Sequence, residues 1–145
     1  MNSALQFNVS PYAPFMQETK VTLGNGIELH VEMGGNPEHP TILLIMGLGA
    51  QMLFWPDFFC KSLIDQGFRV IRFDNRDIGL SSKIREKRKR LNTMKLMSRF
   101  IIGLGNEGAP YTLYDMADDV SMLIDQLGLE KTYLIGCLLY TSPSP

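Results

Sequence analysis

The fold of this chain is decided by residues 42–51, which read ILLIMGLGAQ. The first five are apolar without alternation, a pattern typical of a strand buried on both faces of a parallel sheet. Gly47 and Gly49 then allow the backbone to turn sharply and leave amide N–H groups pointing into the space above the sheet. Such donors can bind a developing oxyanion. A plain strand-to-helix turn is the alternative interpretation.

Further strands and helices are predicted after this strand. Residues 69–74 and 131–135 form two more apolar runs of strand length. Helical periodicity and end signals predict helices over residues 56–67 and 112–128, the second with a capping pattern at its start. The alternation of strand and helix predicts an α/β fold, in which three interior parallel strands carry helices on both faces.

The sequence before residue 42 predicts a β-hairpin that leads into the sheet. Residues 19–23 and 27–33 alternate apolar and polar side chains, and the Gly-Asn-Gly between them is a tight-turn signal. The alternation predicts one wet face, which places His30 at the surface. His39, in a proline-flanked loop, is also expected at the surface. Residues 1–18 show no sustained period and are expected to form an irregular lead-in.

Length and composition place the chain among ordinary globular domains. It has 145 residues, of which 45% are hydrophobic and 20% charged, and a formal net charge of −1. This balance excludes collagen-like, disordered and disulfide-stapled classes and gives no electrostatic case for binding nucleic acid. Eight basic residues and one acidic residue lie in residues 83–99. We interpret the core of this run, residues 83–90, as a solvated loop.

The sequence predicts no cofactor, metal site or membrane segment. The two cysteines, Cys60 and Cys137, lack metal-ligand spacing and favour a reducing compartment. No apolar run reaches 18 residues and no signal peptide is recognisable, so a cytoplasmic protein without membrane contact is expected. Residues 103–108 match the Gly-x-Gly-x-x-Gly pattern but follow helical spacing instead of a strand, so dinucleotide binding is not expected.

Polar residues and glycines follow the other two predicted strands. Ligands bind at the carboxyl ends of strands in open α/β sheets, which makes these positions candidates for a site. After the second strand come Asp74, Arg76, Gly79 and Ser81, and Gly136 ends the third. We interpret the first four as a structural loop, in which the acid and the arginine pair or bond backbone groups and Gly79 supplies an unusual dihedral angle.

These three strand ends resemble the α/β-hydrolase superfamily in their order and spacing. Residues 42–56 and 69–81 are similar to small serine hydrolases of the aclacinomycin methylesterase type, and residues 111–119 strengthen the resemblance. The resemblance covers residues 19–136. It implies an α/β-hydrolase fold, of which this chain holds the N-terminal part, truncated at the nucleophile elbow.

The resemblance also implies roles for particular residues. In this family a Gly-x-Ser-x-Gly elbow exposes the catalytic serine, and Gly136 matches its first glycine. The serine position holds Leu138 and the second glycine position holds Tyr140, so the nucleophile is absent. Leu48 is expected to donate its backbone N–H to the oxyanion, with Gly47 shaping the turn. The triad acid and histidine are expected beyond residue 145.

Residues 137–145 disagree abruptly with the family pattern. They resemble one reading frame of the transposon and adapter DNA used in preparing sequencing libraries, so we interpret them as a non-native tail. The expected organisation is therefore a lead-in over 1–18, a partial hydrolase domain over 19–136 and this tail. A natural hydrolase-like scaffold without catalysis is the alternative interpretation.

The sequence therefore predicts a fragment of a serine hydrolase. The full-length parent is expected to hydrolyse a small carboxylic ester through an acyl-enzyme, without cofactor or metal, whereas this chain is expected to be inactive. The alternative is a non-catalytic binding or interaction protein on the same scaffold. Substrate identity and oligomeric state are not predicted.

Overall fold

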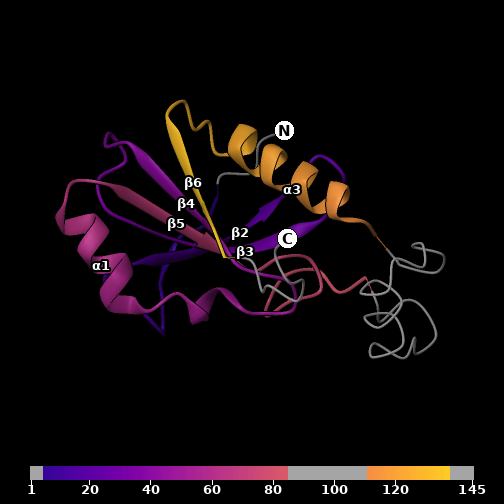
Figure 1. Ribbon diagram of the computed structural model, residues 1–145, viewed down its shortest axis with the longest axis horizontal. Coiled ribbons are helices and arrows are strands. Elements are labelled where there is room, and N and C mark those ends of the chain that lie inside the picture. The colour runs from indigo at the N-terminus through magenta and orange to yellow at the C-terminus, as the bar shows by residue number, and fades with distance from the viewer. Residues whose placement is uncertain (1–4, 85–110, 138–145) are drawn as a thin grey trace, which may run out of the picture.

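A computed structural model describes residues 5–84 and 111–137 of the chain. Its centre is one sheet of six strands in the order β1-β2-β3-β5-β4-β6 (Figure 1). The strands are β1 (Asn8–Val9), β2 (Gln17–Thr22), β3 (Glu28–Gly34), β4 (Thr41–Ile45), β5 (Arg69–Phe73) and β6 (Thr132–Gly136). The helices are the 3₁₀ turn η1 (Met52–Phe54), α1 (Asp57–Asp65) and α3 (Leu113–Gln126).

The order of the strands confirms the α/β fold class. β4 pairs in parallel with β5 on one side and with β6 on the other, as expected of a central strand. β5 pairs antiparallel with β3, which joins the hairpin to the sheet. The expectation of an interior position for the third strand is wrong in this chain, because β6 forms an edge and leaves Tyr133 and Leu134 61% and 56% exposed.

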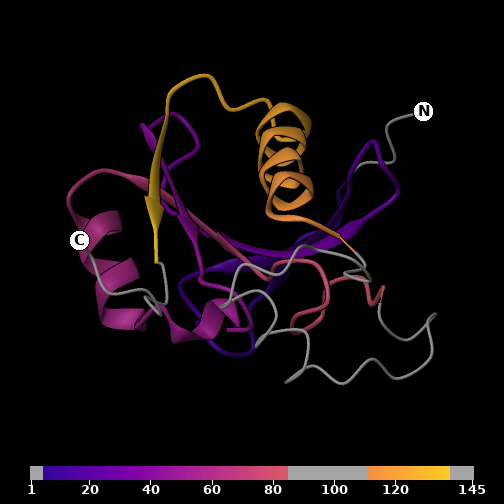
Figure 2. The same cartoon turned by 45° about the vertical axis from the view of Figure 1, so that its right-hand side comes forward.

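The two helices cover opposite faces of the sheet, as Figure 2 shows. Side chains alternate along each strand, so Leu43 of β4 and Ile71 of β5 pack in one cluster with Leu123 of α3. Their strand neighbours Ile42 and Val70 pack in a second cluster on the α1 side. Two apolar cores thus lie on the two faces, as the near-continuous apolar runs predict.

The ends of both helices follow their sequence signals. α3 begins with a capping box, in which the Thr112 side chain accepts the Asp115 N–H and the Asp115 carboxylate accepts the Thr112 N–H. Hydrogen bonds from the backbone N–H and hydroxyl of Thr112 hold the Asp115 pKa below its usual range. α1 is followed by Gly67 at φ +86° and α3 by Gly128 at φ +62°, the left-handed region that favours glycine.

The chain's one tryptophan, Trp55, lies between η1 and α1. The Trp55 ring stacks on Phe59 with 5.7 Å between ring centroids, and its carbonyl accepts a hydrogen bond of 2.8 Å from the Arg72 guanidinium. Arg72 is fully buried and pairs with the equally buried Glu32 at 2.7 Å. An ion pair thus joins β3 to β5 under the amino end of α1.

The hairpin has the expected period, but only β2 shows the expected wet face, because β3 is buried on both faces. Leu29, Val31 and Met33 of β3 enter the α3-side core, and the alternate residues His30 and Glu32 are buried too. Segments remote in sequence cover this second face, and one of them is the N-terminal region. That region is not uniformly irregular, because β1 lies within it, β2 begins in it, and Ala13 and Met16 are buried.

Several sequence expectations fall on residues outside the described ranges. The Gly-x-Gly-x-x-Gly stretch at 103–108, most of the basic run at 83–90 and Leu138 are among them. Within residues 5–84 and 111–137, no helix is long and apolar enough to cross a membrane.

Candidate functional site

The loop after β4 forms a tight turn with an unused backbone donor. The Ala50 N–H donates to the Gly47 carbonyl at 3.2 Å, and Gly49 adopts φ +83°. Leu48, at the apex, is 38% exposed. Its N–H has no hydrogen-bond acceptor among the described residues, so the group is available to an external oxygen.

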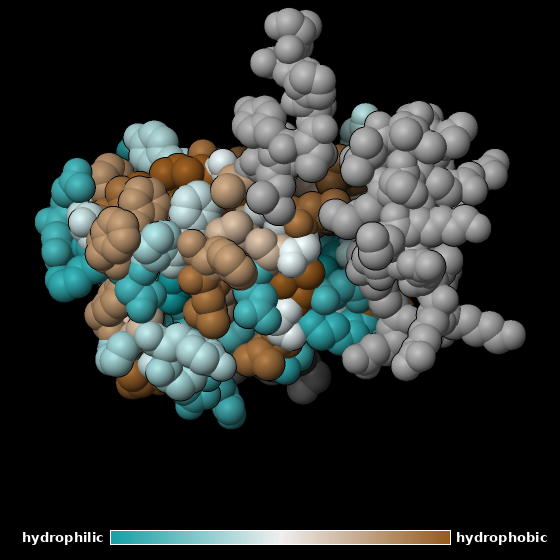
Figure 3. All heavy atoms as spheres, turned by 60° about the horizontal axis from the view of Figure 1, so that its bottom comes forward, coloured by the Kyte–Doolittle hydropathy of each residue, from teal (hydrophilic) through white to brown (hydrophobic). Residues whose placement is uncertain are grey.

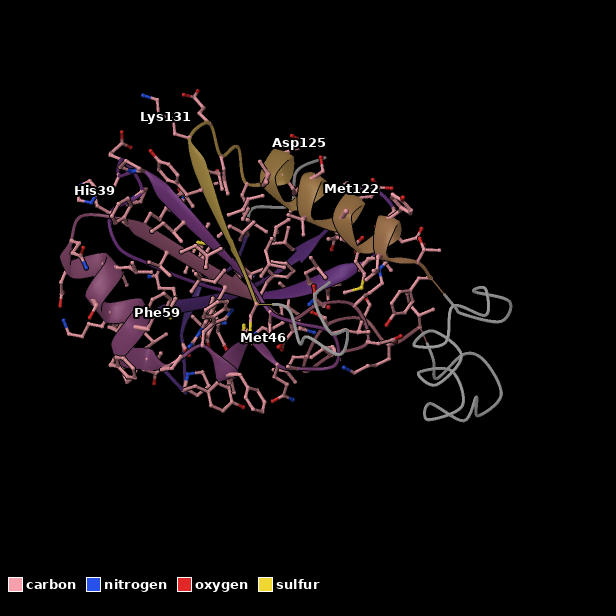
Figure 4. The ribbon with its side chains drawn as sticks, in the orientation of Figure 1. His39, Met46, Phe59, Met122, Asp125 and Lys131 are labelled. Carbon is pink, nitrogen blue, oxygen red and sulfur yellow. The ribbon has the colours of Figure 1, made fainter. Side chains whose placement is uncertain are left out.

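The register of β4 and β6 places Gly136, the expected first glycine of the elbow, level with the end of β4. Gly136 pairs with Ile45, and the Cys137 N–H donates to the Ile45 carbonyl at 2.8 Å. Figure 4 shows Met46, the residue after β4, where the carboxyl ends of β4, β5 and β6 converge. β6 therefore ends beside Ile45, two residues before Gly47.

Two side chains after β5 hold this turn at both of its ends. The Asn75 side-chain amide donates to the Met46 carbonyl at 3.0 Å, and the Met52 N–H donates to Asp74 Oδ1 at 2.8 Å. Both side chains are buried, and a hydrogen bond is hard to replace where water is excluded. Asp74 and Asn75 thus fix the turn that carries Leu48.

The loop after β5 folds around the Asp74 carboxylate. Asp74 Oδ2 accepts the Leu80 N–H at 3.2 Å, and the Ser81 hydroxyl donates to the Asp74 carbonyl at 2.6 Å. Gly79 adopts φ +47°, and a Cβ at this position would overlap the Asp74 carboxylate. Asp77 also has a positive φ, of 67°. The loop is therefore packed too closely for a side chain at residue 79.

Arg76 joins this loop to α3. Its guanidinium makes two hydrogen bonds of 2.6 Å to the Asp119 carboxylate and one of 3.0 Å to the Asp115 carbonyl. It also lies 5.2 Å from the centre of the Tyr111 ring. The Asp119 hydrogen bonds raise the pKa of Arg76, which stays charged. Arg76 thus pairs with Asp119 of α3 and not with Asp74.

His30 is a buried component of this site that the sequence placed at the surface. Its Nε2 lies 3.1 Å from Glu18 Oε2, and its Nδ1 lies 3.6 Å from Asp74 Oδ2. Burial lowers the pKa of His30, but Asp74 and Glu18 outweigh it and raise the pKa above its ordinary value of 6.5. His39 is exposed and lies at the amino ends of the strands, away from Met46 (Figure 4).

Three partners of the Asp74 carboxylate also set its charge. Burial alone would raise the pKa of Asp74, but the His30 ring and the N–H groups of Met52 and Leu80 outweigh burial. Its pKa therefore lies below the usual range, and the group is an anion at neutral pH.

In the described ranges, no three His, Cys, Asp or Glu side chains are placed to hold a metal ion.

Exposed apolar side chains lie on the turn, on η1 and on the loop after β5. Leu48, Leu53, Phe54 and Leu80 are all exposed, with Phe54 at 72%. Because Asp74 binds both the Met52 and the Leu80 backbone, the chain next to η1 and the loop after β5 lie side by side. Figure 3 looks at this side and shows brown, apolar surface broken by teal, polar surface.

Comparison with known proteins identifies the family. A family profile described as "alpha/beta hydrolase fold" matches residues 40–137, from the start of β4 to the end of β6. The chain belongs to this family. The match includes the turn around Leu48, the loop around Asp74 and the strand that ends at Gly136.

Individual relatives support this assignment. The chain is 32% identical over 113 residues to "AB hydrolase superfamily protein YfhM" of Bacillus subtilis, covering 77% of this chain and 32% of that protein. It is 37% identical over 65 residues to "Rhodomycin D methylesterase DnrP" of Streptomyces peucetius, covering 45% of this chain and 22% of the relative.

A solved structure agrees with these sequence relatives. The enol-lactonase from Burkholderia xenovorans LB400 superimposes with a TM-score of 0.58 at 26% identity, covering 81% of this chain and 36% of that one. The chain thus spans about a third or less of the length of the proteins that it matches. Each of the three names refers to a hydrolytic activity or to the hydrolase family.

Proposed function

We propose that this chain is the N-terminal part of a serine hydrolase that cleaves a small carboxylic ester in the cytoplasm. The observation that supports the proposal is the pairing of Gly136, the expected first glycine of the elbow, with Ile45, which lies three residues before Leu48 and its unused N–H. An acyl-transfer site needs a nucleophile and an oxyanion donor about 3 Å from one reacting carbonyl. The methylesterase relative supports an ester as the substrate.

The proposed chemistry assigns the following parts to the complete enzyme. A serine hydroxyl at position 138 attacks the ester carbonyl and gives its proton to a histidine base, and the carbonyl oxygen becomes an oxyanion. The Leu48 N–H donates one hydrogen bond to that oxyanion, and the N–H after the serine donates another. Collapse of the intermediate breaks the ester C–O bond, and the histidine gives its proton to the departing alcohol. Water, which gives a proton to the same histidine, then attacks the acyl-enzyme and releases the acid, and the histidine returns that proton to the serine.

In this chain the proposed nucleophile position holds Leu138. We propose that residues 137–145 are a non-native tail and that residues 19–136 are the partial hydrolase domain. The chain as it stands is then expected to give no hydrolysis of a p-nitrophenyl ester above background. Turnover that co-purifies with the folded 145-residue chain would contradict this part of the proposal.

The first experiment is to read the codons after Gly136 in a longer clone from the same source. The proposal expects a serine at position 138 and a glycine at position 140, followed by an acid and a histidine further on. The purified longer protein is expected to hydrolyse short p-nitrophenyl esters, and replacement of that serine by alanine is expected to abolish turnover.

The second experiment tests the Leu48 donor in the longer protein. Leu48→Pro removes the N–H and is expected to lower kcat by on the order of a hundred-fold or more, whereas Leu48→Met keeps the donor and is expected to have a mild effect. Thermal unfolding of both variants controls for distortion of the turn. Wild-type kcat in a folded Leu48→Pro protein would exclude Leu48 from the oxyanion site.

A second function is favoured by one observation, the presence of Leu138 and Tyr140 in place of serine and glycine. If a longer clone retains both residues in an open reading frame, the protein is a non-catalytic scaffold that binds a ligand or partner. The same clone therefore decides between the two functions.

A further inference from the structure

His30 occupies a place in the site that the proposed reaction does not use. It lies on β3, between Glu18 of β2 and Asp74 at the end of β5, and its side chain is only 4% exposed. We propose that His30, held by Glu18, is a positioning residue that orients the Asp74 carboxylate and through it the turn that carries Leu48. The functional meaning of this role rests on the proposed hydrolase function.

The first step is the contact of the ring with two carboxylates. Nε2 is within hydrogen-bond distance of Glu18 Oε2 at 3.1 Å, whereas Nδ1 is 3.6 Å from Asp74 Oδ2 and has no hydrogen-bond partner among the described residues. A buried ring nitrogen without a hydrogen bond is costly unless a charge compensates for it. The nearest charge is the Asp74 carboxylate, so the ring and this carboxylate are coupled.

The second step is the contact of Asp74 with the turn. Its Oδ1 accepts the Met52 N–H, and its Oδ2 faces His30 and accepts the Leu80 N–H. Rotation of the carboxylate would therefore disturb both backbone hydrogen bonds at once. The His30 backbone adds to the link, because its N–H donates to Ser81 Oγ and its carbonyl accepts the Asp74 N–H.

The third step is the protonation state of the ring. A protonated imidazole has two N–H donors, one for each carboxylate, whereas a neutral imidazole has one. Loss of the proton therefore leaves one buried carboxylate facing a ring lone pair. Since His30 already binds Glu18 at the shorter distance, the Asp74 side is the one that loses its partner.

Other charged groups lie on this face of the sheet. By strand alternation and register β2, β3 and β5 contribute Glu18, Lys20, Glu28, Glu32 and Arg72, and α1 contributes Asp57. Lys20 pairs with Glu28, and Arg72 pairs with both Glu32 and Asp57. Glu18 and Asp74 remain as the two acids that act directly on His30.

The test is an NMR titration of the 145-residue chain from about pH 5 to pH 9. The His30 ring carbon shift gives its midpoint, and the amide shifts of Met52 and Leu80 report the two hydrogen bonds to Asp74. The expected result is that both amides titrate with the His30 midpoint. Amides that stay constant through this midpoint would overturn the proposal, because a ring that only fills space would not move them.

Variants separate His30 from other titrating groups. His30→Gln is expected to abolish the pH dependence of both amides, whereas His39→Gln, in an exposed loop, is expected to leave it unchanged. Glu18→Gln removes one acid and is expected to lower the midpoints of the ring and of both amides together. Glu18→Gln is the deciding variant if His30→Gln does not fold. Ring and amide midpoints that move apart in Glu18→Gln would overturn the proposal.

The experiment does not depend on turnover. A positive titration in a chain whose longer form hydrolyses no ester would refute the proposed function and leave the coupling of His30 to the turn intact. A negative titration in an active longer enzyme would refute the positioning role alone.

Discussion

The two faces of the sheet bury different kinds of side chain. On the α3 face, Leu43 and Ile71 meet Leu123 in an apolar cluster. On the α1 face, apolar packing is joined by the buried pair of Glu32 and Arg72, with His30 and Asp74 beside it. Apolar contacts are non-directional, whereas hydrogen-bonded charges fix the direction of the groups that they touch.

The apolar contacts hold the helices on the sheet, whereas the polar contacts place the loops. The Asp74 and Asn75 side chains bind the backbone of the turn after β4, and Arg72 binds the Trp55 carbonyl before α1. On the α3 face, the described directional contacts to loops come from Asp119, which accepts from Arg76 of the loop after β5 and from Asn25 of the hairpin turn. The directional contacts to the turn that carries Leu48 thus lie on the other side, where the candidate site is built.

The largest effect is expected from breaking the buried pair. Arg72→Met leaves the Glu32 carboxylate buried without its counter-charge and is expected to lower the free energy of unfolding by about 3–5 kcal/mol in urea denaturation. The double variant Glu32→Leu with Arg72→Met removes both charges and is expected to recover most of this loss. A double variant as unstable as the single one would show that hydrogen bonds to Arg72, and not the stranded charge, carry the stability.

A slightly smaller effect is expected on the apolar face. Leu123→Ala leaves a cavity between α3 and the sheet and is expected to cost about 2–5 kcal/mol. The matched control is Leu113→Ala on the same helix, where the side chain is 56% exposed and the expected change is within about 0.5 kcal/mol. Equal losses in the two variants would contradict the assignment of the core to the inner side of α3.

Two glycines with positive φ, Gly79 in the loop after β5 and Gly49 in the turn after β4, offer a sharper test. Gly79→Ala places a Cβ against the Asp74 carboxylate and is expected to cost about 1–3 kcal/mol. Gly49→Ala also has a positive φ but meets no atom within 4 Å, so only the backbone term of about 1 kcal/mol is expected. Chemical denaturation compares the two, and the comparison fails if Gly49→Ala is the more damaging change.

The smallest effect is expected from pH. The raised pKa of His30 gives stability that is fully present below its unfolded value near 6.5 and is lost as the pH rises through the folded value. The lowered pKa of Asp74 gives stability that is present above 3.8 and is lost as the pH falls through its folded value. The free energy of unfolding at mildly acid pH should therefore exceed that at pH 9. In His30→Gln, the decline of this free energy on the alkaline side should disappear. If the free energy of unfolding of that variant still declines as steeply at alkaline pH, the raised pKa of His30 is not the cause of the decline.

The apolar face could be predicted from the sequence because its signals are local. The run at residues 42–46 and the capping pair Thr112 and Asp115 each specify an element through neighbouring residues. Gly67 and Gly128 likewise lie where the helices end. Periodicity and end signals therefore predicted β2 to β6, α1 and α3 in their chain order, but they missed β1 and the edge position of β6.

The polar face could not be predicted because its contacts join residues far apart in the chain. Alternation along β3 correctly placed His30 and Glu32 opposite the apolar residues, but a period does not tell what covers a face. Arg72 and Asp74 meet these residues across about forty positions. One signal was present, since charged residues inside an apolar strand such as β5 seldom stay unpaired.

The single tryptophan allows the two faces of the sheet to be followed separately by spectroscopy. Trp55 stacks on Phe59 and accepts the Arg72 hydrogen bond, so its fluorescence reports the α1 side alone. Circular dichroism reports the whole backbone, α3 included. If the sheet unfolds as one cooperative unit, the two signals will follow the same transition. If the charged side opens first, the emission will change before the helical signal is lost, and a spectrometer will distinguish the two halves of the molecule without any label.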